Sequence, residues 1–260
     1  MTGPPRRLPD DTSAHTDGQL GTKASLLLAR DIVQTMYDSG MQPGDRYLSE
    51  AEGIRRHGVG RGTYREALRF LEHHGVIVMR SGPGGGPEIS QPGAAHLAST
   101  IALLLQFAGA SLQTILDARV ALEPGMAELA AMNATPDDLK AMAADLDAIA
   151  ADIGNYRAFS TAYLSYWRHL AGSTHNALLA FLSPALRAIV NSAGFVPNEP
   201  YREELLGRLR TIHDAVQRHD PATASTAMRE LEVEFRHRLT EGYPRQVART
   251  VSWSDLTYRG

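Results

Sequence analysis

The sequence predicts a mainly α-helical protein of two domains, an N-terminal winged helix-turn-helix followed by a seven-helix antiparallel bundle. Three observations support this prediction. Residues 22–90 have the pattern of three helices and a β-hairpin, a Gln-Pro-Gly connection interrupts the chain near residue 92, and the remainder shows helical periodicity without a strand pattern. A chain of 260 residues is long enough for two domains that each bury a core.

The composition is that of an ordinary globular protein and narrows the classes of function. Hydrophobic residues make up 43% of the chain and charged residues 21%, and the lack of cysteine excludes disulfides and cysteine zinc sites. Residues 23–80 carry nine Lys and Arg against seven Asp and Glu, although the whole chain has a net charge of -3. A mildly basic domain joined to an acidic one is compatible with DNA binding by the first.

The N-terminal tail, residues 1–21, is rich in Pro, Asp and Thr and is expected to be disordered. It lacks the apolar segment of a signal peptide, and the apolar run at residues 101–105 is far too short to span a bilayer. We therefore expect a cytoplasmic protein with no membrane partner, associated with the nucleoid when it binds DNA.

Three helices are expected in the first domain. The first, residues 22–39, has apolar side chains at helical spacing and ends at a glycine. The second begins at Ser49, whose hydroxyl can form a capping box with Glu52. The third follows a short glycine-containing turn and ends near residue 75, which gives the spacing of a helix-turn-helix.

A glycine-rich hairpin, the wing, is expected after the third helix. Residues 76–79 are rich in β-branched side chains and are expected to form a strand. Residues 88–90 can form the returning strand, and residues 82–87 connect the two. One alternative is a phosphate-cradling loop, but no helix start and no Gly-Lys-Ser/Thr sequence follow the glycines. The other alternative is a mobile hairpin that makes no contacts.

The third helix carries the residues that predict DNA binding. Arg61, Arg65 and Arg69 recur every four residues, so they share one face, and Thr63 lies beside them. Arg can pair with guanine edges or phosphates, and Thr can reach a phosphate or a thymine methyl group. The alternative is a solvated basic face on a surface helix.

Residues 41–89 resemble the DNA-binding domain of the GntR family of bacterial transcription regulators. The resemblance rests on three segments and the wing that follows them, and the segments are Gln42–Glu50, Gly58–Leu68 and Leu71–Gly75. Two positions depart from the family pattern. Gly60 stands where the family usually has Ser or Thr, and Ala51 stands where it usually has Arg. Both departures remove DNA contacts, so we expect an unusual operator affinity or sequence.

The resemblance implies which residues bind DNA. The positions of Arg61, Thr63 and Arg65 contact operator DNA in the family, and those of Ser81 and Gly82 reach the edge of the groove. The expected DNA-binding residues are Ser49, Arg61, Gly62, Thr63, Arg65, Arg69, Ser81 and Gly82.

The second domain is expected to span residues 96–240, after a linker at residues 91–95. Seven helical segments are expected at residues 96–107, 112–133, 137–153, 156–171, 176–192, 201–219 and 221–240. Short loops between them predict an antiparallel bundle. The C-terminal tail, residues 241–260, lacks a clear period; it is disordered, or Trp253 packs on the bundle or on a second subunit.

This half resembles the ligand-sensing FCD domain of the FadR-type branch of the GntR family. The matching segments are Arg119–Glu123, Ala127–Ala131, Asn176–Leu179 and Ala222–Met228. The additional segment at residues 96–107 favours the seven-helix version of this domain. The resemblance implies a helical domain for effector binding and dimerisation.

Many members of that branch hold a metal ion with one Asp and three His. The resemblance places these ligand positions on Tyr163, Trp167, Leu209 and Leu231, none of which is a useful ligand for a divalent metal. His213 could face the same cavity but lacks a visible partner. We therefore expect neither metal nor cofactor; the alternative is a metal-dependent, carboxylate-sensing regulator of the same family.

Two interpretations of the apolar residues at these positions stay open. They fill the core, or they line a pocket for an apolar effector such as a fatty acid or acyl-CoA, with Arg119 available for a carboxylate. A polar carboxylate effector is a third possibility, and Arg119 can instead pair with Glu123 one turn away. The expected pocket residues are Arg119, Tyr163, Trp167, Leu209, His213 and Leu231.

The resemblance also implies a mechanism. A homodimer places two recognition helices on a palindromic operator, and an effector in the bundle changes their spacing and so weakens or strengthens operator binding. Of repressor and activator, we expect a repressor. An enzyme is not expected. The sequence has no nucleophile elbow, no pair of carboxylates at positions that indicate acid–base catalysis, and no cofactor-binding fingerprint. The remaining alternative is a winged helix used for protein contacts without DNA.

Overall fold

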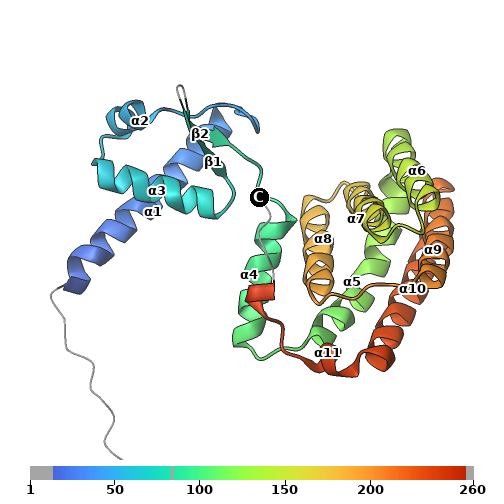
Figure 1. Ribbon diagram of the computed structural model, residues 1–260. Helices are drawn as coiled ribbons and strands as arrows, with labels where there is room; N and C mark the ends of the chain where they lie inside the picture. Colours follow the sequence, from blue (N-terminus) through green and yellow to red (C-terminus); the bar gives the residue numbers. More distant parts are fainter. Residues whose placement is uncertain (1–13, 83–84, 256–260) are drawn as a thin grey trace, which may run out of the picture. The chain divides into compact units, whose positions relative to one another are not determined.

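Two compact units, Met1–Pro92 and Gly93–Gly260, make up the chain. A computed structural model describes residues 14–82 and 85–255 (Figure 1), with side chains from residue 23 to residue 254 of these ranges. Within them, helices dominate both units and a two-stranded antiparallel sheet lies in the first. The predicted, mainly helical fold class is confirmed.

The N-terminal unit has the element order of a winged helix-turn-helix. Its elements are α1 (Ala14–Asp38), α2 (Glu50–His57), α3 (Arg61–His73), β1 (Ile77–Arg80) and β2 (Gly86–Ile89). Helix α1 starts at Ala14 rather than at residue 22, because extending an existing helix needs no new nucleation. The expectation of disorder at residues 14–21 is thereby corrected, and the rest of the predicted tail lies outside the described residues.

The two ends of helix α2 and its packing on α3 are each fixed by identifiable residues. The Ser49 hydroxyl accepts from the Glu52 backbone N–H at 3.4 Å, and the Glu52 carboxylate accepts from the Ser49 backbone N–H at 3.1 Å, which is the predicted capping box. Gly58 ends α2 in the left-handed conformation, with φ at 64°. A Cβ at Gly53 would lie 2.1 Å from the Tyr64 ring, so glycine alone lets α2 approach α3 this closely.

The wing is joined to the core of this unit through two isoleucines. Ile77 and Ile89 face each other in the register of β1 and β2, and both are buried with α1 and α3. Pairing continues to Arg80 and Gly86, so the strands are displaced by one or two residues from the predicted ranges. The displacement follows from which side chains point inward, because register is set by the buried face.

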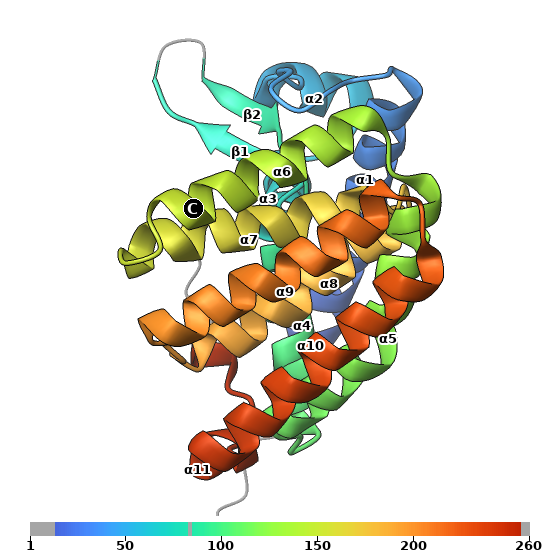
Figure 2. The ribbon, with the colours of Figure 1, turned by 90° about the vertical axis from the view of Figure 1, so that its right-hand side faces the viewer.

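The C-terminal unit is a helical bundle whose consecutive helices are joined by short loops (Figure 2). Its main helices are α4 (Ala94–Phe107), α5 (Leu112–Asn133), α6 (Pro136–Ala151), α7 (Tyr156–Gly172), α8 (Ala177–Ser192), α9 (Glu199–Gln217) and α10 (Pro221–Gly242). Helix α5 packs along α10, α6 along α7 and α4 along α8. All seven predicted segments are present, with ends moved by at most a few residues. No helix in the described part of the chain is both long and apolar enough to cross a bilayer.

Polar side chains at the loop ends define where these helices begin. Each accepts hydrogen bonds from backbone N–H groups of the first turn, and substitution of such a cap costs about 1 kcal/mol of stability. The capping residues are Thr135, Asn155, Asn176, Asn198 and Asp220.

The segment after α10 packs back onto the first helix of the bundle. A short helix, α11 (Pro244–Ala248), is followed by a 3-10 turn, Trp253–Asp255. Val247 and Val251 are buried with residues of α4, α5 and α8. The Trp253 indole N–H donates to the Ser99 hydroxyl at 2.6 Å. Among the outcomes expected for this tail, which were disorder, packing on the bundle and packing on a second subunit, the structure shows packing on the bundle up to residue 255.

Candidate functional site

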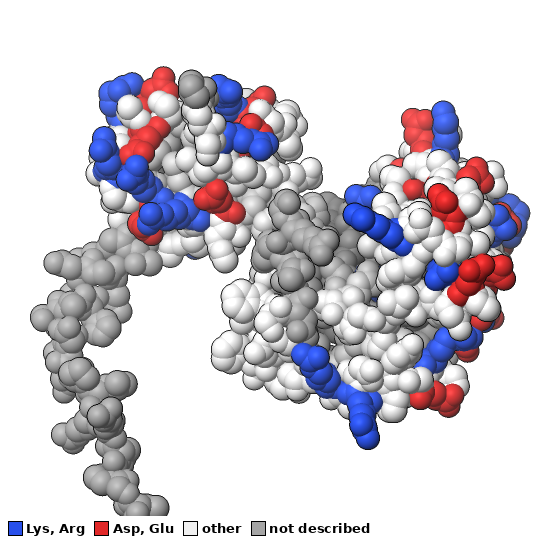
Figure 3. Space-filling model, in the orientation of Figure 1, with Lys and Arg blue, Asp and Glu red and all other residues white. Residues whose placement is uncertain are grey.

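Helix α3 separates an apolar face from a basic face. Tyr64, Leu68 and Leu71 are buried in the core, whereas the side chains of Arg61 and Arg65 are 77% and 59% exposed and that of Arg69 is also exposed. We call Arg61, Arg65 and Arg69 the basic face. Figure 3 shows basic and acidic side chains interleaved over this unit. An exposed row of guanidiniums on the second helix of a helix-turn-helix is the arrangement that reads a major groove.

Intramolecular carboxylates already pair with the basic face. The Nε atoms of Arg61 and Arg65 each lie 3.2 Å from one oxygen of Glu50, and Arg69 Nη1 lies 2.6 Å from Glu66. Exposed ion pairs of this kind contribute at most about 1 kcal/mol. These pairs are therefore too weak to keep the arginines from contacting DNA.

The other expected DNA-binding residues occupy different positions. Gly62 is exposed and Thr63 half-buried at the start of α3, and Ser81 and Gly82 are exposed at the wing. The Ser49 hydroxyl is engaged as the cap of α2 and lies 2.5 Å from the Glu52 carboxylate.

A concave surface of about 510 Å³ lies between α3 and the wing. It brings together three of the expected residues, Ser49, Arg65 and Arg69, with Arg80 of the wing. Arg61, Gly62, Thr63, Ser81 and Gly82 lie outside its lining.

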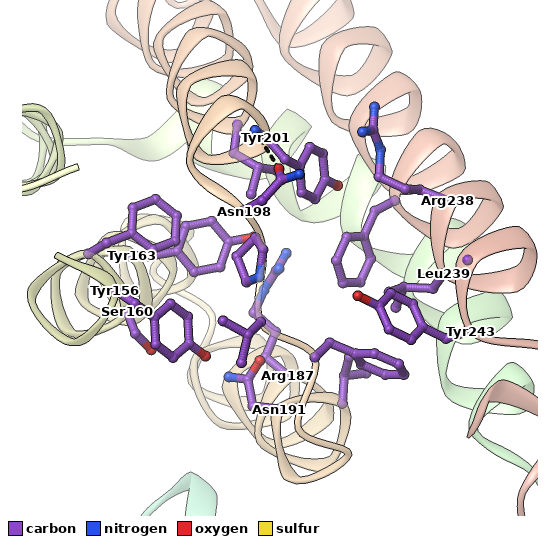
Figure 4. Close-up of a pocket in the computed structure, with 18 of the residues that line it drawn as sticks. Tyr156, Ser160, Tyr163, Arg187, Asn191, Asn198, Tyr201, Arg238, Leu239 and Tyr243 are labelled. Atoms are coloured by element: carbon purple, nitrogen blue, oxygen red, sulfur yellow. Dashed lines mark hydrogen bonds between the residues drawn. The ribbon is translucent and has the colours of Figure 1, made fainter. Parts of the chain in front are cut away.

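A second cavity, the bundle pocket, has a volume of about 300 Å³ and lies within the C-terminal unit. Residues of α5, α7, α8, α9 and α10 and of the α8–α9 connection line it. Figure 4 shows tyrosines and asparagines around its rim and Arg187 at its centre. The lining residues are Arg119, Tyr156, Phe159, Ser160, Tyr163, Arg187, Val190, Asn191, Phe195, Val196, Pro197, Asn198, Tyr201, Leu205, Phe235, Arg238, Leu239, Gly242 and Tyr243.

Two of these lining arginines belong to a buried charge cluster, which we define as Arg119, Glu123, Arg187 and Glu232. Arg119 Nη2 and Arg187 Nη2 lie 2.9 and 3.0 Å from the Glu232 carboxylate, Arg119 Nε lies 3.3 Å from Glu123, and Arg187 also contacts Glu123. Ser183 donates to Glu123 at 3.2 Å. The cluster joins α5, α8 and α10, and it contains the ion pair between Arg119 and Glu123 that their spacing suggests.

The two carboxyl groups of the charge cluster differ in their affinity for a proton. Burial, reinforced by repulsion from Glu232, raises the pKa of Glu123 although the guanidiniums oppose it. Burial acts in the same direction on Glu232, but Arg119 and Arg187 outweigh it and hold the pKa of Glu232 below the usual range. With the proton on Glu123, two guanidiniums face one carboxylate. The base of the bundle pocket then carries a net positive charge in a region of low dielectric.

Aromatic rings fix both guanidiniums in place. The Arg187 guanidinium carbon lies 3.2 Å from the centroid of the Trp167 ring, and that of Arg119 lies 5.0 Å from the Phe235 ring. Such cation–π contacts stabilise desolvated cations. Tyr163 packs against the Trp167 ring edge, with 5.9 Å between centroids.

The structure divides the six expected pocket residues. Arg119 and Tyr163 line the bundle pocket. The other four do not, so the expectation that all six share one pocket is corrected; these are Trp167, Leu209, His213 and Leu231.

The physical reason differs among these four residues. Arg187 covers the Trp167 ring, and Leu209 and Leu231 are fully packed in the core. His213 is buried on α9, and burial lowers its pKa, which favours the neutral ring.

Sequence reasoning missed two members of the charge cluster, Arg187 and Glu232, of which Arg187 also lines the pocket. Arg187 lies in the otherwise apolar helix α8, and Glu232 lies on the inward face of α10. A charged residue in an apolar helical stretch is almost never buried without a partner. That signal was present in the sequence, but the pairing of Arg187 with Glu123 and Glu232 spans 64 and 45 residues and needs the fold.

The residues at the family's metal-ligand positions do not fit a metal ion. Tyr163, Trp167, Leu209 and Leu231 offer no imidazole or carboxylate, and the Arg187 cation on the Trp167 ring would repel a divalent ion. Among the described residues, no three His, Asp or Glu side chains gather where they could hold a metal.

Fold and site together define a DNA-binding transcription regulator with a ligand pocket in its second domain. The FCD domain matches residues 114–232. The chain is 31% identical over 205 residues to the uncharacterized HTH-type transcriptional regulator Rv0494 of Mycobacterium tuberculosis, covering 77% of this chain and 83% of that one. It thus belongs to the GntR family of transcription regulators and carries an FCD effector-binding domain.

Two further comparisons agree with this assignment. The HTH-type transcriptional repressor NanR of Escherichia coli K12 is 25% identical over 219 residues, which cover 79% of this chain and 80% of the repressor. A solved structure described as Streptococcus agalactiae GntR has a TM-score of 0.64 at 21% identity, covers 82% of this chain and 99% of its own, and shows the same fold. The relatives are transcriptional regulators, which confirms that the chain is not an enzyme.

Proposed function

We propose that this regulator is a cytoplasmic repressor that binds a palindromic operator as a homodimer. The basic face, Arg61, Arg65 and Arg69, supports this proposal because it is exposed on the second helix of the helix-turn-helix. Two copies of α3 would enter successive major grooves of one DNA face. An effector in the bundle pocket would control operator affinity through its differential binding to two arrangements of the dimer.

The effector that we propose is a small organic carboxylate with an apolar or aromatic body. The observation that carries this proposal is the pair Arg119 and Arg187, whose guanidiniums both lie at the base of the bundle pocket. Phe159, Val190 and Leu239 provide an apolar wall for the rest of the molecule. A pocket of about 300 Å³ is at the small end of ligand sites and does not enclose an intact acyl-CoA.

A panel of carboxylates, each paired with its own primary amide, tests the effector class. We expect at least one carboxylate to raise the thermal unfolding temperature of the full-length protein while its amide does not, because the amide lacks the charge. Native mass spectrometry of the same samples should show one carboxylate per chain on a dimer and no metal. Equal shifts with acid and amide, or a stoichiometric metal, would contradict the proposal.

Selection of duplexes from a random-sequence library by the full-length protein tests operator binding. We expect enrichment of a palindrome, and we expect the stabilising carboxylate to weaken binding of the selected duplex. A protein that enriches no sequence and binds DNA only weakly would instead act through protein contacts of its winged helix.

A further inference from the structure

One carboxylate lies between two arginines of the basic face. Glu50, the first residue of α2, accepts a hydrogen bond from Arg65 Nε on Oε2 at 3.2 Å. Its other oxygen, Oε1, accepts no hydrogen bond but lies within ion-pair distance, 3.2 Å, of both Arg61 Nε and Arg65 Nε. That oxygen is shielded from solvent, although both arginines are largely exposed. Glu50 thus joins α2 to two successive turns of the helix proposed to read DNA.

The arrangement differs from the other ion pairs of this unit. Arg69 pairs with Glu66 on its own helix, and Arg80 pairs with Glu88 across the wing. Glu50 instead bridges two guanidiniums from a neighbouring helix, so that its position constrains both of them at once.

A carboxylate on a guanidinium Nε leaves the two Nη groups free. These Nη groups form a planar fork that matches O6 and N7 of guanine, whereas a single phosphate oxygen accepts from any donor of the group. The negative charge of Glu50 also repels phosphates that approach Arg61 or Arg65. Both effects penalise contacts with the DNA backbone more than contacts with base edges.

We propose that Glu50 is a specificity-determining positioning residue, which orients Arg61 and Arg65 toward base edges and hinders their use as non-specific phosphate contacts. This inference rests on the proposed DNA-binding function of α3. By its charge alone, the Glu50 carboxylate opposes DNA binding. In this role, it raises the ratio of operator affinity to non-specific affinity.

Substitution Glu50→Gln removes the charge and keeps the shape. Helix α2 keeps its Ser49–Glu52 capping box, and exposed ion pairs contribute little to stability, so the fold is retained. Asp38→Asn is the matched control: it removes one negative charge from the same unit at an exposed position on α1, away from the basic face.

The experiment measures the affinity of full-length wild-type, E50Q and D38N protein for two duplexes at several salt concentrations. One duplex is selected by the wild-type protein from a random library, and the other is a scramble of it. We expect E50Q to bind the scramble about threefold to tenfold more tightly and to lose about tenfold in the ratio of the two affinities. Its salt slope should be steeper by about 0.9 for each additional phosphate that the arginines neutralise. D38N should keep the ratio within about twofold of wild type.

Each other outcome overturns the inference. A ratio that E50Q leaves unchanged shows that Glu50 acts only through bulk charge or through the fold, whether both affinities rise or fall. If the ratio of the two affinities falls equally in D38N, the loss of any negative charge in this unit is sufficient, and Glu50 has no special role. If wild-type protein enriches no duplex and binds the unselected library no better than bovine serum albumin does, the proposed DNA-binding function fails and takes this inference with it.

Discussion

Arg187 places its guanidinium carbon 3.2 Å from the centroid of the Trp167 ring, in the interior of the bundle. Trp167 stands at a position where the family resemblance predicts a metal ligand. A cation that is covalently part of the chain therefore lies over this ring. Glu123 and Glu232 pair with that cation within the charge cluster, so the stability of the bundle depends on how these four side chains are kept together.

Replacement of Arg187 by Met should destabilise the C-terminal unit. The change leaves Glu123 and Glu232 buried with one guanidinium instead of two, and such losses cost about 3–5 kcal/mol. Urea denaturation followed by circular dichroism measures the free energy of unfolding. Arg238→Met is the control, because Arg238 lines the same pocket but pairs with Glu204 and Glu234 near the surface; it should cost no more than about 1 kcal/mol. Equal losses would argue against a buried charge cluster.

The raised pKa of Glu123 should make stability depend on pH. The folded state keeps a proton that the unfolded state releases above the ordinary pKa of 4.5, so stability falls as the pH rises from there into the neutral range, by at most about 1.4 kcal/mol per pH unit. Glu123→Gln imitates the protonated carboxyl and should flatten this part of the profile. Thermal unfolding of both proteins across this range is the measurement. If the stability of both proteins changes with pH in the same way, a group other than Glu123 holds the proton.

Arg65→Ala should greatly weaken binding of the selected duplex and lower its salt dependence. The side chain is 59% exposed on the basic face, so its loss removes DNA contacts with little effect on folding. A lost phosphate contact reduces the salt slope by about 0.9, and a lost base contact costs about 1–3 kcal/mol. Arg210→Ala, an exposed position of α9, removes the same charge from the other unit and should bind as wild type. Unchanged affinity of R65A would contradict the placement of the recognition helix.

Gly53→Ala should destabilise the N-terminal unit. The added Cβ would lie 2.1 Å from the Tyr64 ring, and overpacking of this kind costs about 1–3 kcal/mol. Gly125→Ala is the opposite case, because a Cβ there meets no atom within 4 Å in helix α5. That change should stabilise the protein by about 0.5–1 kcal/mol. Calorimetry of the two variants separates these effects, and a neutral G53A would mean that α2 shifts freely on α3.

Local sequence signals were sufficient to predict the helices and strands, but they were insufficient to predict which residues meet at the bundle pocket. The Ser49–Glu52 spacing and the Thr135 cap give helix starts because those bonds span only three residues. The i+4 spacing also gave the Arg119–Glu123 pair. Arg187 and Glu232 join that pair from other helices, and only packing of α5, α8 and α10 brings them together. The start of α1 at residue 14 was not predicted either. Residues 14–21 have a weak helical pattern of their own, and they extend a helix that is already nucleated by the residues after them.

The contact between Trp253 and α4 has a consequence for cutting the chain into domains. The FCD match begins at residue 114 and ends at residue 232, so it leaves out both α4 and the segment that binds it. A fragment cut to that match would lose Val247 and Val251 from the core together with the helix they cover. Deleting either the first helix of the bundle or its last segment strips the other of its packing partner, so a fragment of this regulator that folds and binds its effector keeps both.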